Sequence, residues 1–523
     1  MKIERTKNAT RNIVFGILEK IYQIVVPFIL RTALIYILGV EYLGLNSLFV
    51  SILSVLNLAE LGVGNAMVYS MYKPIAEDDE KTICALMALY KKYYRIIGSV
   101  ILMAGLILCP FLPKLIKMDT VPSDVNIYIL YALNLGNTVI SYWFFAYKKS
   151  LLDAHQRTDI TSKITLITST FMYIAQLIVL LIFKSFYLYT AVLFITSVIN
   201  NLFTAISVDK LYPFYKPNGK LQSSQVSSIN GRVKDLFTAK IGGVVVGSVD
   251  TIVISAYLGL TALAIYQNYM YLVKAVISMM TTIFIACTAG IGNSIILEST
   301  EKNFGDLKIF TFLISWVAGF CTCCFLCLFQ PFMALWVGED LLLEFSSVIC
   351  FSIYFFVYEI NQLLNTYKDA AGIWHEDRFR PLITALCNLI LNLILVRYIG
   401  VLGVILCTVI STVCVGMPWL LHNLFSVLFS PSYLRTYLCD LFGYIFVITV
   451  GCAMTYILCS FVPFSGIIEI VIDLLICCIV PNVLYYLIFR KSREFKHVMK
   501  LVDRILGGKF SMLKRLCVRR TYR

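Results

Sequence analysis

The sequence predicts an all-α polytopic membrane protein with about fourteen transmembrane helices. Of its 523 residues, 59% are hydrophobic and 14% are charged, whereas soluble domains carry roughly 25% charged residues. Apolar runs of about 20 residues, long enough for a helix to cross a hydrocarbon core of about 30 Å, recur along nearly the whole chain. A β-barrel would show short alternating segments instead, so the continuous runs favour helices.

The first expected span follows Lys2, Arg5, Lys7 and Arg11 and contains no small-residue cleavage site, so it reads as a retained helix rather than a signal peptide. The expected spans cover residues 13–37, 44–70, 90–112, 125–147, 162–184, 187–208, 233–257, 262–296, 308–330, 343–367, 381–397, 402–426, 437–460 and 466–489.

The distribution of basic residues predicts the orientation of these spans. If the N-terminus is cytoplasmic, 36 of the 44 Lys and Arg residues fall in inner segments and four fall in outer loops. This bias follows the positive-inside rule and predicts that both termini are cytoplasmic. The expected location is the cytoplasmic (inner) membrane. The longest outer loop runs only from about residue 111 to 126, so no folded domain is expected outside.

The C-terminal tail carries most of the net charge of +14. Residues 490–523 hold twelve basic and two acidic side chains, so the basic character lies next to the membrane and does not indicate nucleic-acid binding. Apolar residues at helical spacing predict an amphipathic helix suited to an anionic inner leaflet. These residues are Phe495, Val498, Met499, Val502, Ile505 and Leu506.

An internal repeat appears when the chain is shifted by 220 residues. Leu38-Gly39 then matches Leu258-Gly259, and Tyr147-Lys148 matches Tyr367-Lys368. A shift of six helices preserves membrane orientation, which predicts two parallel six-helix repeats that enclose a cavity and move by alternating access. The expected domains are a lobe at 1–208, a cytoplasmic linker at 209–232, a second lobe at 233–426, two additional transmembrane helices at 427–489 and the basic tail at 490–523.

The seventeen cysteines do not predict disulfides, because nearly all lie inside apolar runs, where a free cysteine behaves as a small hydrophobe. One group of cysteines has a spacing similar to that of metal-binding motifs, namely Cys321, Cys323, Cys324 and Cys327. It has no His or carboxylate nearby in the sequence, so packing is the expected role and no metal site is predicted. His155 and His375 fall in inner loops without metal-ligand spacing, which favours loop or cap roles.

Charged residues at membrane depth are candidates for a substrate cavity, because each costs about 2.5 to 3.5 kcal/mol on insertion scales. Lys20 and Lys240 are equivalent under the repeat and could grip a pyrophosphate, or could extend to the inner headgroups. Arg31 suits a bidentate anion, or could pair with Glu60 or Asp250. The remaining candidates for the cavity wall are Lys274, Asn65 and Asn293.

The intramembrane carboxylates Glu60, Asp250 and Glu359 could carry a coupling proton or sodium ion, or could form buried ion pairs. Close helix approach or a local hinge is expected at the G-x-G pairs, which are Gly62 with Gly64 and Gly290 with Gly292. Kinks are expected at three prolines within spans, namely Pro27, Pro418 and Pro481.

Several blocks of sequence resemble a known family. They are Arg31–Leu45 (RTALIYILGVEYLGL), Ala59–Asn65 (AELGVGN), Lys240–Tyr269 (KIGGVVVGSVDTIVISAYLGLTALAIYQNY) and Tyr367–Pro381 (YKDAAGIWHEDRFRP). They look like the polysaccharide flippases of the Wzx type, which export O-antigen and capsule precursors, within the multidrug/oligosaccharidyl-lipid/polysaccharide (MOP) exporter superfamily. The resemblance implies a V-shaped exporter fold with two extra C-terminal helices.

The resemblance also implies a substrate. This is undecaprenyl-pyrophosphate-linked oligosaccharide, moved from the inner to the outer leaflet, with polysaccharide polymerase and export machinery as partners. Related lipid-linked flippases have a cavity lined by cationic residues, and the resemblance implies that Arg31 and Lys240 play this part here. No catalytic residue or cofactor is expected.

Two alternatives stay open. A small-molecule or multidrug cation antiporter on the same fold would favour an acidic, aromatic cavity. A membrane glycosyltransferase or polymerase, which is a different class of protein, would need catalytic acids in a sizeable outer loop, and the short outer loops do not supply one.

Overall fold

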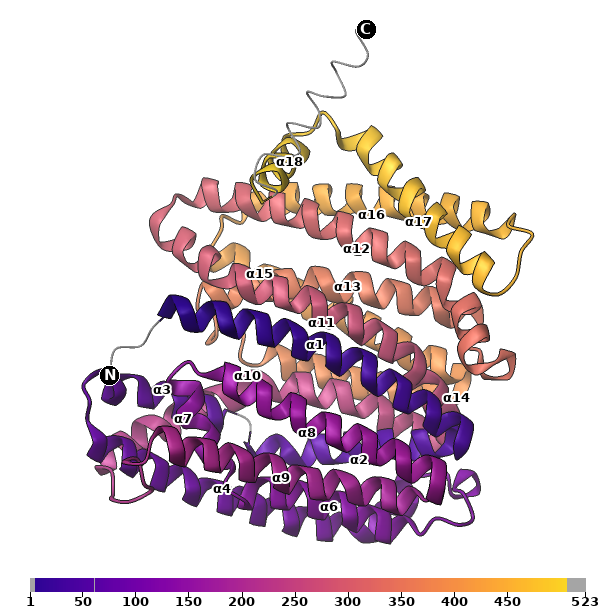
Figure 1. Ribbon diagram of the computed structural model, residues 1–523. Helices are drawn as coiled ribbons and strands as arrows, with labels where there is room; N and C mark the ends of the chain where they lie inside the picture. The colour runs from indigo at the N-terminus through magenta and orange to yellow at the C-terminus, as the bar shows by residue number, and fades with distance from the viewer. Residues whose placement is uncertain (1–4, 61, 506–523) are drawn as a thin grey trace, which may run out of the picture. The chain divides into compact units, whose positions relative to one another are not determined.

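A computed structural model describes the backbone of residues 5–60 and 62–505. Side chains are described over the same ranges except at 5–19, 235, 239, 240, 286, 501, 502, 504 and 505. The regular elements in these ranges are helices, as Figure 1 shows. The chain divides into a first unit, residues 1–268 with 381–404, and a second unit, residues 269–380 with 405–523. This division differs from the lobes expected at 1–208 and 233–426, whose boundaries remain a prediction.

The first unit contains the helices of the N-terminal half of the chain. They are α1 (Arg5–Ile37), α2 (Val40–Leu56), η1 (Asn57–Glu60), α3 (Val63–Ala76), α4 (Glu80–Leu108), η2 (Cys109–Phe111), α5 (Leu112–Leu115), η3 (Met118–Thr120), α6 (Ile127–Trp143), η4 (Ala146–Lys148), α7 (Lys149–Ala154), α8 (Thr158–Ile178), η5 (Val179–Phe183), α9 (Phe186–Leu211) and α10 (Ser223–Tyr257). Two long helices have parts in both units, namely α11 (Leu260–Leu297) and α14 (Arg380–Ser411).

The second unit contains the remaining helices. They are α12 (Thr300–Val337), η6 (Glu339–Leu341), α13 (Phe345–Ala370), η7 (Thr412–Gly416), α15 (Met417–Val427), α16 (Ser432–Ser460), α17 (Ile467–Phe489) and α18 (Arg493–Ile505). Pro331 and Pro481 lie inside α12 and α17, and Pro27 lies inside α1. Pro418 stands in the first turn of α15, directly after the π-helix η7.

Within the described residues, eleven helices are long and apolar enough to cross a membrane, or twelve if the bent halves of α10 are one span. The chain is therefore an all-helical multi-pass membrane protein, but the expected count of fourteen is not confirmed and remains a prediction. Helix α6 is among the expected spans but has only 17 residues. Residues 380–427 count as one span although α14 leaves helical geometry at Ile399 and Gly400.

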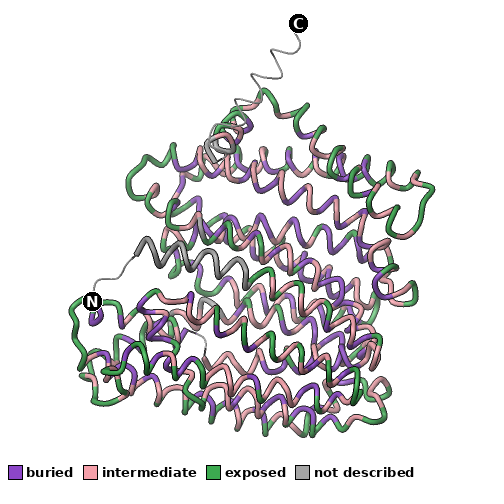
Figure 2. The backbone as a smooth tube through the Cα atoms, viewed as in Figure 1, coloured by how far each residue is buried: buried purple, intermediate pink, exposed green. Residues whose placement is uncertain are grey.

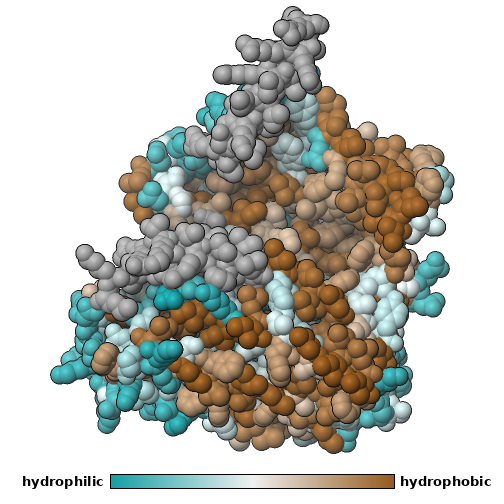
Figure 3. Space-filling model, viewed as in Figure 1, coloured by the Kyte–Doolittle hydropathy of each residue, from teal (hydrophilic) through white to brown (hydrophobic). Residues whose placement is uncertain are grey.

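Packing in the first unit runs through neighbouring helices. Helix α1 packs on α8, α8 on α9, α9 on α6, and α6 on α4, while α10 packs on α2 (Figure 1). Buried, intermediate and exposed residues alternate along these helices (Figure 2). Figure 3 shows that the outward surface over α8 and α9 is largely apolar. Ile182 of η5, the π-helix that follows α8, is 69% exposed, which suits a side chain solvated by lipid rather than water.

Two glycine turns in the first unit share one hydrogen-bond pattern. Leu38 and Gly39 both donate to the carbonyl of Leu34, and Leu258 and Gly259 both donate to the carbonyl of Ile254. Gly39 has φ of 128° and Gly259 has φ of 94°, values that favour glycine. These pairs are the ones that the 220-residue shift superimposes, so the repeat is visible locally, while the arrangement of two complete six-helix repeats stays a prediction.

The G-x-G pairs behave differently from each other. Gly62 has φ of 90° and separates η1 from α3, so the expected hinge position is a break in the helix. A Cβ at Gly62 would lie 2.6 Å from Cβ of Leu236 on α10, so the position also permits a close approach. Gly290 and Gly292 lie inside the continuous helix α11, where no break occurs.

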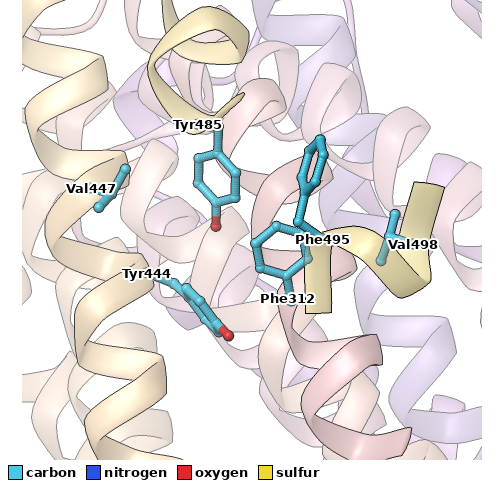
Figure 4. Packing of buried hydrophobic residues seen from close by; sticks show 6 residues of the cluster. All are labelled: Phe312, Tyr444, Val447, Tyr485, Phe495 and Val498. Carbon is cyan, nitrogen blue, oxygen red and sulfur yellow. The ribbon is translucent and has the colours of Figure 1, made fainter. Parts of the chain in front are cut away.

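Helix α12 is the centre of the second unit and packs against α13, α16, α17 and α18. An aromatic and aliphatic cluster joins α12 to α16, α17 and α18 (Figure 4). Its buried members are Phe312, Tyr444, Val447, Tyr485, Phe495 and Val498. The apolar face of the tail helix α18 therefore meets protein at Phe495 and Val498, which corrects the expectation that these residues lie on the inner leaflet. Val502, Ile505 and Leu506 lie outside the described side chains.

Candidate functional site

Helices α10 and α14 lie side by side in the first unit and place a buried carboxylate between them. A Cβ at Gly242 would lie within 2.5 Å of backbone atoms of Pro381, so the two helices meet at this point because Gly242 has no side chain. Further along both helices, Arg397 donates to the hydroxyl of Tyr257 at 3.2 Å. The stretch between these contacts contains Asp250.

Asp250 is surrounded by asparagines of α14. Its side chain is buried, and its Oδ1 accepts a hydrogen bond of 2.6 Å from Nδ2 of Asn392. The same Nδ2 donates to Oδ1 of Asn388 at 3.1 Å. Oδ1 of Asn392 is buried and has no hydrogen-bond partner among the described residues. The result is a group of carboxylate and amide oxygens deep in an apolar helix pair.

Such a group of oxygens can bind a hard cation or hold a proton. Na⁺, like Ca²⁺ and Mg²⁺, is a hard cation suited to carboxylate and carbonyl oxygens, and ionisable groups within a membrane mark ion pathways. Asp250 was a candidate from the sequence, but Asn388 and Asn392 were missed. The signal was present, because two asparagines four residues apart in an apolar span lie on one face of the helix.

Arg31 of α1 lies against the start of α11 in the same unit. Its Nε donates to Oδ1 of Asn268 at 2.7 Å, and Asn268 is fully buried. Gln267, the neighbour of Asn268, donates to Thr251 at 2.9 Å, and Thr251 is the neighbour of Asp250. The arginine and the oxygen cluster are therefore linked through the α10–α11 contact.

Glu60 lies at the break between α2 and α3, beside a group of tyrosines that the sequence pattern did not single out. Its Oε1 accepts from the hydroxyl of Tyr94 at 3.3 Å, and Tyr94 accepts from Tyr90 at 2.5 Å. The ring of Tyr142 lies 5.4 Å from that of Tyr94. A discontinuous helix that carries a carboxylate at its break is typical of a transporter binding region.

Glu359 of α13 is the buried carboxylate of the second unit. It is 0% exposed, and neither carboxylate oxygen has a hydrogen-bond partner among the described residues. An uncompensated charge there would be costly, so the position suits a carboxyl group that is neutral or that binds a cation.

The other predicted cavity residues are spread over both units. The side chains of Lys20 and Asn65 in the first unit are exposed, as are those of Lys274 and Asn293 in the second. The Lys240 side chain lies outside the described part of the structure. The structure thus brings Asp250 together with α14, Arg31 with α11 and Glu60 with α4, while a joint site of the lysines remains a prediction.

Comparison with known proteins gives no match to a family model and none to a curated protein. Solved structures do match. Lipid II flippase MurJ in an inward closed conformation has a TM-score of 0.67 and 16% identity, and the match covers 91% of this chain and 99% of that one. The chain has the fold of the MOP superfamily. This confirms the fold part of the resemblance, while membership of the Wzx-type family is not shown.

Other structures with the MOP fold match as well. An inward-facing multidrug resistance MATE transporter has a TM-score of 0.61 and 14% identity over 78% of this chain and 95% of that one. A MOP superfamily transporter from Pyrococcus furiosus, described as having a binding pocket of reverse polarity, has a TM-score of 0.55 and 14% identity over 82% and 96%. These neighbours are transporters rather than enzymes.

Proposed function

We propose that the protein is a flippase that moves undecaprenyl-pyrophosphate-linked oligosaccharide from the inner to the outer leaflet by alternating access. The observation that carries the proposal is the likeness to a lipid II flippase over 91% of the chain. A guanidinium at membrane depth, held by an amide of α11, supports it because an anionic headgroup needs a cationic partner. The Wzx-like sequence blocks favour a polysaccharide repeat unit as the cargo.

The headgroup assignment is tested by replacing Arg31, Lys20 and Lys240 singly with Ala in a strain that depends on this gene for glycan export. Each variant should stop or strongly reduce export while the amount of protein in the membrane is unchanged. Arg31→Lys should restore only part of the export, because an ammonium lacks the planar fork that binds a phosphate through two hydrogen bonds. Normal export in all three Ala variants would show that these residues do not bind the headgroup.

For ion coupling, we infer that Asp250 with Asn388 and Asn392 binds the coupling cation. Transport into proteoliposomes should depend on a sodium or proton gradient, and Asn392→Ala should raise the sodium concentration for half-maximal transport about tenfold, since a charge-assisted hydrogen-bonding group is worth about 1.5 kcal/mol or more. Asn218→Ala, which alters an exposed loop asparagine, is the matched control. Equal ion dependence of both variants would contradict this role.

A second candidate function is export of organic cations. The carboxylate of Glu60 among Tyr90, Tyr94 and Tyr142 favours it, because aromatic faces and a carboxylate bind cations. Efflux of a fluorescent lipophilic cation from cells that produce the protein distinguishes the two functions. A flippase predicts no efflux above that of cells with an empty vector, whereas an antiporter predicts efflux that Glu60→Gln removes.

A further inference from the structure

Cysteines from three helices of the second unit converge in one place. Cys323 and Cys327 lie on α12, Cys452 on α16 and Cys477 on α17, and all four are buried. The sequence shows the pair on α12 as two cysteines four residues apart, which occupy one face of the helix. It does not show that α16 and α17 each add a cysteine to that face.

Three of the thiols are close enough together to bind one metal ion. The Sγ atoms of Cys323, Cys327 and Cys477 all lie within 4.8 Å of one another. Cys452 packs with these three in one buried cluster. Sulfurs around a tetrahedral metal at about 2.3 Å would stand about 3.8 Å apart. Bringing Cys323, Cys327 and Cys477 onto one metal therefore needs shifts of about 1 Å or less, and Cys452 would have to move in from its packed position beside them to complete the four.

A second observation in the same place comes from Asp473, one turn before Cys477 on α17. Asp473 is only 3% exposed, and its Oδ1 has no hydrogen-bond partner among the described residues. Cys459 packs against the same cysteine cluster and stands one residue from the end of α16. A buried carboxyl group and further thiols therefore lie on the helices that carry the cluster.

We propose that Cys323, Cys327, Cys452 and Cys477 bind one thiophilic d¹⁰ metal ion, of the Zn²⁺ or Cu⁺ class. Soft thiolates select these ions over hard cations. Each thiol that binds loses its proton to solvent, so Zn²⁺ bound by four thiols releases four protons and leaves a complex of charge −2, and Cu⁺ bound by three releases three. The metal would be structural: it would link α16 and α17 to α12, and its site is separate from the proposed transport site.

The proposal is tested on the full chain purified in detergent under reducing conditions. Metal content is measured by mass spectrometry after separate incubation with Zn²⁺ and with Cu⁺ and removal of the unbound ion, and Co²⁺ is added as a spectroscopic probe. We expect one equivalent of bound metal and a thiolate-to-cobalt charge-transfer band. The Zn²⁺ and Cu⁺ incubations decide which of the two ions is retained.

The variants Cys477→Ser and Cys477→Ala are compared with Cys478→Ser, which changes the exposed neighbour on the same helix. Cys477→Ser and Cys477→Ala should lower metal affinity by roughly tenfold or more, because even changes to the surroundings of metal ligands have effects of that size. Cys478→Ser should bind like the wild type. Absence of retained metal and of the cobalt band in the reduced wild type, or equal binding by the Cys477 and Cys478 variants, would overturn the proposal. Neither result depends on transport.

Discussion

Asp250 and its two asparagines show how a single side chain acquires a role from its neighbours. The sequence marks Asp250 as a charge at membrane depth that could bind a coupling ion or form an ion pair, but it does not identify the groups around it. The structure adds amide groups from α14, which is far away along the chain, and a distance of 2.6 Å from Asn392. Which helix faces Asp250 depends on packing between distant segments, so residue-level prediction could identify the carboxylate but not its partners.

His155 gives a pH-dependent prediction at the residue scale. Its ring is buried against Tyr212 with centroids 4.3 Å apart, and Nδ1 lies 2.8 Å from the carbonyl of Leu151. Burial lowers the pKa of His155 below its usual value of 6.5. The unfolded state therefore binds the proton at a higher pH, so the stability from neutral His155 is present above about pH 6.5 and is lost as the pH falls toward the folded pKa.

The thermal unfolding temperature in detergent should fall between pH 7 and pH 5.5, and His155→Asn should flatten this dependence. His375 is the equivalent position under the repeat, but its side chain is exposed. His375→Asn is therefore the control and should leave the slope unchanged. Identical slopes for the wild type and His155→Asn would show that His155 does not titrate with unfolding.

At the scale of elements, helix contacts depend on a few positions without side chains. Gly242 lets α10 reach Pro381, whereas a Cβ at the adjacent Gly243 would meet nothing within 4 Å. Both are equally plausible helix positions by sequence, so the pattern predicts α10 itself but not which glycine carries the contact. The same holds for the two G-x-G pairs, of which only the first interrupts its helix.

Gly242→Ala should destabilise the protein by about 1 to 3 kcal/mol, because the added methyl group must displace backbone of α14. Gly243→Ala should be neutral or stabilising by up to about 1 kcal/mol, since alanine favours the helix. Thermal unfolding in detergent measures both. A larger loss in Gly243→Ala than in Gly242→Ala would contradict the observed packing.

The tail helix α18 yields a second prediction for an element. Phe495 packs with Phe312 and Trp316, so Phe495→Ala should loosen α18 and speed tryptic cleavage at the basic residues of the tail. Deleting a buried aromatic ring costs about 3 to 5 kcal/mol in a fully closed core, and a terminal helix should show the lower part of this range or less. His497→Ala, at an exposed neighbouring position, should be cleaved at the wild-type rate.

For the whole molecule, composition and apolar runs predicted the class of the protein correctly. The chain is helical and multi-pass and has the MOP fold. The orientation in the membrane and the count of fourteen spans remain predictions. For the count, hydropathy does not say whether α6, with 17 residues, crosses the membrane, or whether the broken helix α14 crosses it once or twice. The tail also differs from the expectation, because α18 packs on protein at Phe495 and Val498. An apolar face at helical spacing suits a protein surface as well as a lipid surface, so the sequence did not distinguish the two.

Reporter fusions test the orientation. A green fluorescent protein fused after residue 523 should fluoresce, and alkaline phosphatase inserted between α16 and α17, near residue 464, should be active, because the two positions are expected on opposite sides of the membrane. A silent fluorescent fusion combined with active phosphatase at the C-terminus would reverse the topology.

The turns at Gly39 and Gly259 have an evolutionary consequence. A backbone conformation that only glycine adopts easily is the kind of feature that persists after a gene duplication, while the surrounding side chains diverge. If the predicted repeat arose by duplication, its two turns have since acquired different surroundings, because a Cβ at Gly259 would lie 2.6 Å from Thr120 and one at Gly39 would lie 3.1 Å from Glu41. Across homologous chains, Gly259 should therefore tolerate replacement less often than Gly39.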